Sequence, residues 1–319
     1  MQEYNPAQWL TFFYIYCFLG WCYESTYCSI RDKKLTNRGF LHGPFLPIYG
    51  SGAIALLLLT NPVKDNIILT FIVAMIGASI LELVTGMVME EIFKVRYWDY
   101  SESRLNIKGY ISLVPSLLWG IMGILLMNLI HSPIERLVFR LEHKAFYIVV
   151  LIITICMAVD FAISFRTAID LRNILISMEQ AKIELTKIQK RMDLIIATAG
   201  ETVNNGKELI SKGLSERKKH YEEQISIRLT SLKDMKEVIE NKLDRISFIS
   251  KENPKLYEKI KNEVKKLRKQ YKKRIHSNES LVEYRKREKI KIFKRNPSIT
   301  SKKFAESLEE LKKYLFNKM

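Results

Sequence analysis

Apolar residues are concentrated in five runs within the first half of the chain. The runs cover residues 9–30, 45–60, 67–89, 110–130 and 145–165. A helix that crosses the apolar core of a bilayer needs about 20 mainly apolar residues. Only the run over 45–60, which opens with prolines, is clearly shorter than that. The pattern predicts an all-α, multi-pass membrane bundle of about five spans.

After the fifth run, apolar residues recur at alternating steps of three and four. The series is Leu171, Ile174, Met178, Ala181, Leu185, Ile188, Met192 and Ile195. Such a seam is typical of the a and d positions of a coiled coil. It predicts either that two tails pair, which would make the protein a homo-oligomer, or that one tail folds back on itself as an antiparallel bundle.

The remainder of the tail has the apolar spacing of further amphipathic helices. We expect them over residues 207–250, 256–275, 281–294 and 301–316, with Asn253-Pro254 separating the first two. The chain is thus expected to consist of a transmembrane domain, residues 1–165, and a basic cytoplasmic helical coiled-coil domain, residues 166–319.

Charge is distributed very unequally between these two parts. The chain carries 51 Lys and Arg against 34 Asp and Glu, a formal charge of +17. Residues 1–165 hold twelve of each sign, so the tail carries the whole excess. The most basic stretches, 265–274 and 284–295, would suit either a solvated helix face or contact with anionic lipid headgroups. Attraction to such headgroups contributes about 1 kcal/mol of binding free energy for each basic residue near the membrane surface. Nucleic acid is a disfavoured partner, because the tail has no zinc knuckle or RNA-binding motif.

The short loops indicate how the bundle is oriented. Two loops, 31–44 and 90–109, are rich in Lys and Arg, whereas the loop over 61–66 has only Lys64. Basic loops stay on the cytoplasmic side, so the N-terminus is predicted outside and the tail in the cytoplasm, in a protein of the cell membrane. The basic loop over 131–144 opposes this order and is expected to form an amphipathic helix along the interface.

This topology places several polar residues at one depth on the cytoplasmic side. Glu24, Glu82 and Asp160 fall within spans, where a charged side chain costs about 2.5–3.5 kcal/mol on insertion scales. We predict a polar pocket that opens to the cytoplasm. Its candidate substrate-binding residues are Glu24, Arg38, Gly39, His42, Gly43, Tyr49, Glu82, Asp99 and Asn106. In the alternative interpretation these acids reach the interface or pair with loop cations and serve packing alone.

Several motifs in order resemble a known family. They are Gly20-Trp21-x-x-Glu24, NRGFLHGPFLPIYG at 37–50, Glu82-x-x-Thr85-Gly86, Trp98-Asp99-Tyr100-Ser101, Asn106-x-x-Gly109 and Trp119-Gly120. Over about residues 9–130 the chain is similar to the putative ABC-transporter type IV family, also called putative ABC transporter permeases, of Firmicutes membrane proteins. The resemblance implies transport of a substrate that the sequence does not identify. Because no nucleotide-binding motif is found, it also implies a separate ATPase subunit as partner.

Two other classes of function stay open. In an enzyme acting on a lipid or polar headgroup, Arg38 and the backbone amides of Gly39, Gly43 and Gly50 would bind phosphate, and Glu24 or Glu82 would act as a base. The sequence has no GxSxG or HExxH motif in support. The third class is a membrane scaffold or regulatory protein. The four cysteines lack the spacing of a metal site, and no metal or cofactor is predicted.

Overall fold

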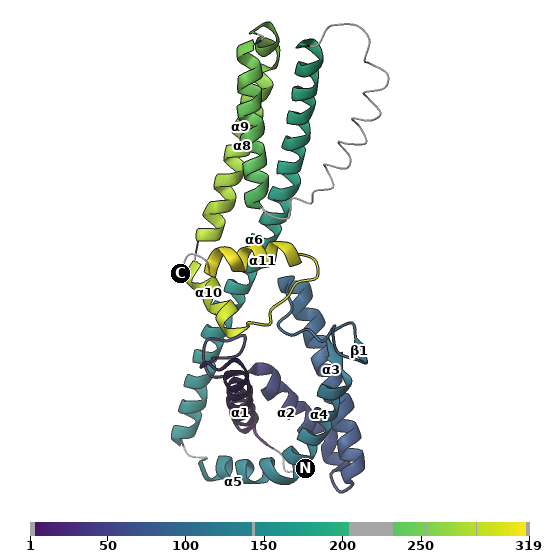
Figure 1. The fold of residues 1–319 in the computed structure, drawn as a ribbon. Coiled ribbons are helices and arrows are strands. Elements are labelled where there is room, and N and C mark those ends of the chain that lie inside the picture. The colour runs from purple at the N-terminus through teal and green to yellow at the C-terminus, as the bar shows by residue number, and fades with distance from the viewer. Residues whose placement is uncertain (1–3, 142–143, 204–231, 253, 285, 317–319) are drawn as a thin grey trace. The chain divides into compact units, whose positions relative to one another are not determined.

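The computed structural model describes residues 4–141, 144–203, 232–252, 254–284 and 286–316 (Figure 1). The described residues are mostly helical, as predicted. The elements in chain order are α1 (Pro6–Asp32), α2 (Pro47–Thr60), the 3-10 helix η1 (Asn61–Val63), α3 (Ile67–Phe93), β1 (Asn106–Ile107), β2 (Ile111–Ser112), α4 (Leu113–Leu125), the π-helix η2 (Leu126–Ile130), α5 (His131–Leu141), α6 (Lys144–Val203), α8 (Leu232–Glu252), α9 (Pro254–Glu283), α10 (Lys286–Arg295) and α11 (Ala305–Phe316).

The chain forms two compact units. The first unit comprises Met1–Arg172 together with Arg287–Lys303, and the second comprises Asn173–Lys286 together with Phe304–Met319. The long helix α6 contributes its first half to one unit and its second half to the other. Residues 287–303, which the sequence assigns to the tail, therefore fold with the first unit.

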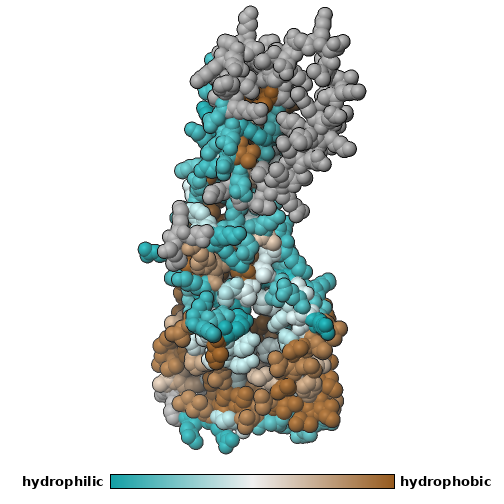
Figure 2. Space-filling view, in the orientation of Figure 1, coloured by the Kyte–Doolittle hydropathy of each residue, from teal (hydrophilic) through white to brown (hydrophobic). Residues whose placement is uncertain are grey.

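Three helices of the first half are long and apolar enough to cross a membrane. They are Ile67–Phe93, Leu113–Leu141 and the helix over Ala145–Ile196, and Pro47–Val63 is a shorter apolar helix. Their apolar side chains point outward to an unusual degree, as Ile68 (68% exposed) and Val114 (66%) illustrate. Figure 2 shows such side chains gathered in a broad band over the first unit. This is the surface of a membrane protein, and the two further predicted spans, over 9–30 and 45–60, stay predictions.

Local signals explain where the helices begin. Asn5 caps α1 in a capping box with Gln8, so that the backbone N–H group of each residue donates to the side chain of the other. Helix α2 begins at Pro47, in the first turn, where the missing N–H of proline costs least. The proline-rich start of the second run thus marks the actual start of a helix.

The fourth apolar run begins later than expected. A run from 110 was predicted, but α4 begins at Leu113, because residues 106–112 form a small antiparallel hairpin of β1 and β2. The Asn106 side chain accepts from the Gly109 N–H at 2.9 Å, and Gly109 has φ +79°, a conformation that favours glycine. Strands β1 and β2 are the only elements among the described residues that are not helical. They form the end of the loop between α3 and α4.

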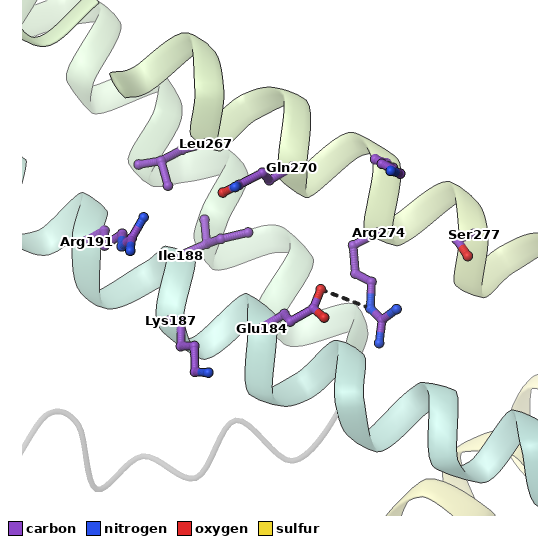
Figure 3. Close-up of a pocket in the computed structure, with 9 residues that line it drawn as sticks. Glu184, Lys187, Ile188, Arg191, Leu267, Gln270, Arg274 and Ser277 are labelled. Atoms are coloured by element: carbon purple, nitrogen blue, oxygen red, sulfur yellow. Dashed lines mark ion pairs between the residues drawn. The ribbon is translucent and has the colours of Figure 1, made fainter. Parts of the chain in front are cut away.

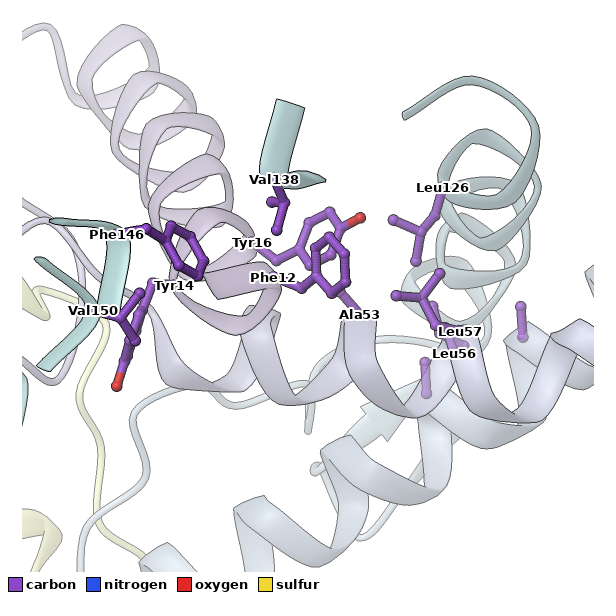
Figure 4. Packing of buried hydrophobic residues seen from close by; sticks show 12 residues of the cluster. Phe12, Tyr14, Tyr16, Ala53, Leu56, Leu57, Leu126, Val138, Phe146 and Val150 are labelled. Carbon is purple, nitrogen blue, oxygen red and sulfur yellow. The ribbon is translucent and has the colours of Figure 1, made fainter. Parts of the chain in front are cut away.

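A cluster of large apolar side chains holds the helices of the first unit together (Figure 4). Phe12 of α1, Leu57 of α2, Leu126 of η2, Val138 of α5 and Val150 of α6 all belong to it and are buried. Elements far apart in sequence thus share one core. Between α1 and α2 the backbones also approach closely, since a Cβ placed on Gly50 would lie 2.4 Å from Cys17 Sγ and 2.7 Å from the Phe13 carbonyl oxygen.

The second unit consists of the second half of α6 with α8, α9 and α11. The seven residues of the predicted heptad seam that belong to this unit, from Ile174 to Ile195, are buried within the single chain. Leu171, which belongs to the first unit, is buried as well. Polar contacts add to this packing: Lys242 of α8 pairs with Asp193 of α6 at 2.5 Å, and Tyr271 of α9 donates to Glu240 of α8 at 3.1 Å. Burial within one chain is the arrangement of the fold-back alternative, and pairing of two tails stays a prediction. Part of the helix predicted over 207–250, residues 207–231, lies outside the described residues.

We expect Gly50→Ala to destabilise the first unit, whereas Gly52→Ala, two residues further along α2, should not. A Cβ at position 50 would overlap Cys17 and Phe13, and overpacking typically costs about 1–3 kcal/mol. A Cβ at position 52 would meet Leu81 at an ordinary 3.7 Å. Thermal unfolding of the detergent-solubilised full chain measures the difference. Equal melting temperatures for the two variants would contradict the close packing of α1 on α2.

Candidate functional site

Glu24 lies near the end of α1 and is held by two partners from other segments. The Tyr49 hydroxyl, in the first turn of α2, donates to Glu24 Oε2 at 2.6 Å. The guanidinium of Arg38 lies 3.5 Å from Glu24 Oε1, between Nε and that oxygen. The carboxylate thus has a hydroxyl donor and a guanidinium beside it, although it remains partly exposed.

Glu82 of α3 is more deeply buried, at 6% exposure, and its partners are aromatic. Trp119 Nε1 donates to Glu82 Oε2 at 3.0 Å, and the Tyr100 hydroxyl donates to Oε1 at 3.2 Å. No Lys or Arg among the described residues forms an ion pair with Glu82. Its donors among the described residues are neutral, and an ionised carboxylate buried without a cation is costly.

The two carboxylates belong to one connected cluster. The ring of Tyr49, which binds Glu24, lies 5.6 Å from the ring of Trp119, which binds Glu82. Tyr100 interacts electrostatically with both acids. We call Glu24, Tyr49, Glu82, Tyr100 and Trp119 the carboxylate cluster. It joins α1, α2, α3, α4 and the loop after α3.

Arg38 connects this cluster to the loops at the end of the bundle. Its Nη2 donates to the Tyr97 carbonyl oxygen at 3.2 Å and to Ser298 Oγ at 3.2 Å. The backbone N–H of Arg38 also donates to Ser25 Oγ at 3.1 Å. The planar guanidinium can make these contacts in different directions at once, which a lysine ammonium on the same stem could not reproduce.

Asp160 of α6 anchors the glycine- and proline-rich loop over 33–46. Its carboxylate accepts from the backbone N–H of His42 at 3.0 Å and of Gly43 at 2.7 Å, and from Ser164 Oγ at 3.3 Å. The His42 ring atom Nδ1 lies 2.9 Å from Asp160 Oδ1. The Gly43 amide is therefore already bonded to a carboxylate, so it is not free to bind the phosphate envisaged for an enzyme.

The loop after α3 is built around the buried Arg96. Its guanidinium pairs with Glu90 and, at 3.3 Å, with Asp99, and it lies 4.4 Å from the centre of the Tyr110 ring. Partial burial acts to raise the pKa of Asp99, but hydrogen bonds from Ser101 and Thr300 and the charge of Arg96 lower it below its usual value. The ion pair therefore stabilises the fold at neutral pH and is lost only as the pH falls through that lowered pKa.

The predicted site residues thus occupy three connected places. Glu24, Tyr49 and Glu82 lie in the carboxylate cluster, Arg38 joins it to the loops, and Gly39, His42 and Gly43 lie in the loop that Asp160 anchors. Asp99 and Asn106 hold the loop after α3, where the Asn106 amide donates to the Ser101 and Ser103 carbonyl oxygens. Sequence reasoning did not assign roles to Tyr100 and Trp119, although both lie in the family-like motifs.

A second candidate region lies in the second unit, between α6 and α9 (Figure 3). It is an open groove of about 530 Å³. Its charged lining consists of Lys187, Arg191, Lys273, Arg274 and one acid, Glu184, which pairs with Arg274 at 3.2 Å. The excess of cations suits an anionic partner, which agrees with the basic character of the tail.

Comparison with known proteins finds a family model that matches part of the chain. Residues 11–165 match the family described as "Putative ABC-transporter type IV". The resemblance expected from the sequence motifs is therefore confirmed, and the match extends beyond it to the end of the fifth apolar run. No curated protein and no solved structure matches the chain.

Asp160→Asn is expected to loosen the loop over 33–46. An amide side chain has one accepting atom, so either the His42 or the Gly43 N–H would face an NH2 group. Hydrogen bonds to charged groups contribute about 1.5–3 kcal/mol. Amide hydrogen exchange should accelerate in residues 37–46, and Ser164→Ala, which leaves both backbone bonds in place, should have a smaller effect. Unchanged exchange in Asp160→Asn would show that the carboxylate does not anchor the loop.

Proposed function

We propose, from the match of residues 11–165 to the ABC-transporter type IV family, that the chain is a multi-pass transporter subunit whose substrate site is centred on Glu24 and Glu82. The observation that carries this proposal is the carboxylate cluster. Two acids on different helices each accept from an aromatic donor, and the rings of these donors, Tyr49 and Trp119, contact each other. Ionisable groups within membrane spans are characteristic of substrate and ion pathways. Arg38, His42, Tyr49, Asp99 and Asn106, with Gly39 and Gly43, form the cytoplasmic side of this pocket.

The proposed topology has five spans, with the N-terminus outside and the tail in the cytoplasm. Contacts between loops support it: Arg38 from the loop over 33–46 reaches the carbonyl oxygen of Tyr97 in the loop after α3, so the two most basic loops meet at one end of the unit. The positive-inside rule assigns that end to the cytoplasm.

The substrate class and the energy source follow from different features. Glu82 would bind a cationic group or a proton of the substrate, because its donors are neutral and would leave the negative charge of the ionised carboxylate uncompensated. Glu24, which has the Arg38 guanidinium beside it, would share that group. A separate ATPase subunit would supply energy through the cytoplasmic loops. The basic tail, including the groove of the second unit, would contact anionic lipids at the inner leaflet.

An enzyme acting on a lipid headgroup is the alternative, and the loop gives it less support than the sequence did. The N–H groups of His42 and Gly43 are bonded to Asp160, and that of Gly50 is bonded to the Leu46 carbonyl oxygen at 3.4 Å. A phosphate would have to displace Asp160 to use the first two.

Single introduced cysteines test the topology. Leu35, which is 99% exposed in the first loop, should be labelled in Leu35→Cys only when the cytoplasmic face is accessible, as in inside-out vesicles. Asp65→Cys, in the loop after α2, should be labelled only from outside. Both variants carry alanine in place of the four native cysteines. Labelling of position 35 from the outside would overturn the proposed pocket.

Neutral variants of the two acids test the site. In cells that carry Glu24→Gln or Glu82→Gln, the distribution of at least one solute between cells and medium should shift to that of cells lacking the protein. Glu91→Gln is the matched control, since Glu91 lies on the same helix as Glu82 but its side chain is 82% exposed. Metabolite and lipid profiles measure the outcome. A changed lipid species with an unchanged solute distribution would favour the enzyme instead.

A further inference from the structure

Residues 287–303, which we call the strap, leave the second unit and pack as part of the first. The strap contains most of α10 and the extended segment that follows it. Its apolar side chains Ile290, Ile292, Phe293 and Ile299 are buried. It therefore does not form the solvated basic helix that its composition suggests, although it includes most of the basic stretch 284–295.

The strap contacts the loop over 33–46 at three of the residues predicted to form the pocket. Asn296 Nδ2 donates to the Gly39 carbonyl oxygen at 3.1 Å, and Ser298 Oγ accepts from Arg38 at 3.2 Å. The Glu288 carboxylate lies 3.5 Å from His42 Nε2. Because the same Arg38 guanidinium faces Glu24, one side chain joins the strap to the carboxylate cluster.

The strap also pairs with the loop after α3 as a short antiparallel strand would. The backbones of Thr300 and Arg96 exchange two hydrogen bonds, of 2.8 and 3.0 Å. The Thr300 hydroxyl donates to Asp99 at 3.1 Å, and the Ser301 hydroxyl donates to the Lys94 carbonyl oxygen at 2.7 Å. The strap thus spans both cytoplasmic loops of the proposed pocket.

One residue of the strap, Arg295, is buried at a cost in free energy. Arg295 is 6% exposed, yet among the described residues its Nε and Nη1 have no hydrogen-bond partner. Burial lowers its pKa, and the charges of Asp160 and Glu288 oppose that effect. Since unmet donors on a buried guanidinium cost free energy, release of the strap into water would recover part of that cost.

We propose that the strap is an intramolecular latch. It closes the cytoplasmic side of the first unit over Arg38 and Glu24 and opens to admit the substrate. This inference rests on the proposed function and adds its regulation. The strap continues directly into α9 and α11 of the second unit at its two ends, so a partner or lipid that acts on the tail can pull on the latch through the chain itself. The closed state is favoured by four buried apolar side chains, by the backbone pairing of Thr300 with Arg96 and by several side-chain hydrogen bonds, so the open state is a minor population.

The test measures access to position 24 in inside-out vesicles. The full chain carries Glu24→Cys with its native cysteines replaced by alanine, and the probe is a permanently cationic thiol reagent that does not cross membranes. The release variant is Asn296→Ala/Ser298→Ala/Thr300→Val, which removes four side-chain hydrogen bonds to the two loops and keeps the apolar anchors. The control is Thr186→Val/Ser280→Ala, whose hydroxyls bond only to carbonyl groups of their own helices.

The latch predicts that labelling at position 24 accelerates about tenfold or more in the release variant and stays within about twofold in the control, since each lost hydrogen bond shifts a closed–open equilibrium several-fold. A second reporter, Ile299→Cys, follows the strap itself, because Ile299 is fully buried. If Ile299→Cys is labelled faster in the release variant while position 24 is not, the strap opens without guarding the site, and the latch is overturned. If both labelling rates are the same in the release variant as in the unaltered strap, the contacts that it removes do not hold the strap, and the latch is again overturned. Labelling of position 24 only from the outer face would overturn the proposed pocket and the latch with it.

Discussion

The arrangement of the first unit depends most on the contacts of the Arg38 guanidinium. The guanidinium faces the Glu24 carboxylate, the Tyr97 carbonyl oxygen and the Ser298 hydroxyl, which belong to α1, to the loop after α3 and to the strap. Near a membrane boundary each of these acceptors would otherwise need water or another donor. A single planar cation with several fixed N–H directions satisfies them together. The strap and the Glu24 carboxylate are therefore linked through the Arg38 side chain, which contacts both.

Asp160 has a complementary role on the opposite side of the same loop. It accepts two consecutive backbone N–H groups, those of His42 and Gly43, and so fixes an irregular segment where regular hydrogen bonding is absent. Irregular backbone at membrane depth is tolerated only when protein or a water-filled cavity surrounds it. The loop therefore has a defined conformation, in which the Gly43 amide is bonded to the Asp160 carboxylate.

Much of the fold follows from local patterns that act over one or two helical turns. The apolar runs over 67–89 and 145–165 recur in helices able to span a membrane, Pro47 begins α2, and the heptad residues such as Leu185 are buried. The hairpin at 106–112 was not expected, because its signal is a turn of Asn106 and Gly109 within four residues, too short to interrupt an apolar run in a hydropathy pattern. The polar residues Glu24 and Glu82 were identified by the cost of placing charge in a span. The partners of Glu24, Arg38 and Tyr49, were predicted in the same pocket. The partners of Glu82, Tyr100 and Trp119, were not.

The sequence by itself determined that this is a helical membrane chain with a basic tail, because apolar periodicity and charge act locally and are visible in any short window. Only the tertiary structure decided that Tyr49, Tyr100 and Trp119 join the two acids, and that Thr300 pairs with Arg96 more than 200 positions earlier. The strap has the composition of any basic amphipathic helix, and its burial depends on complementary donors and acceptors distributed over distant loops. Such complementarity is a property of the folded surface, so no local pattern encodes it.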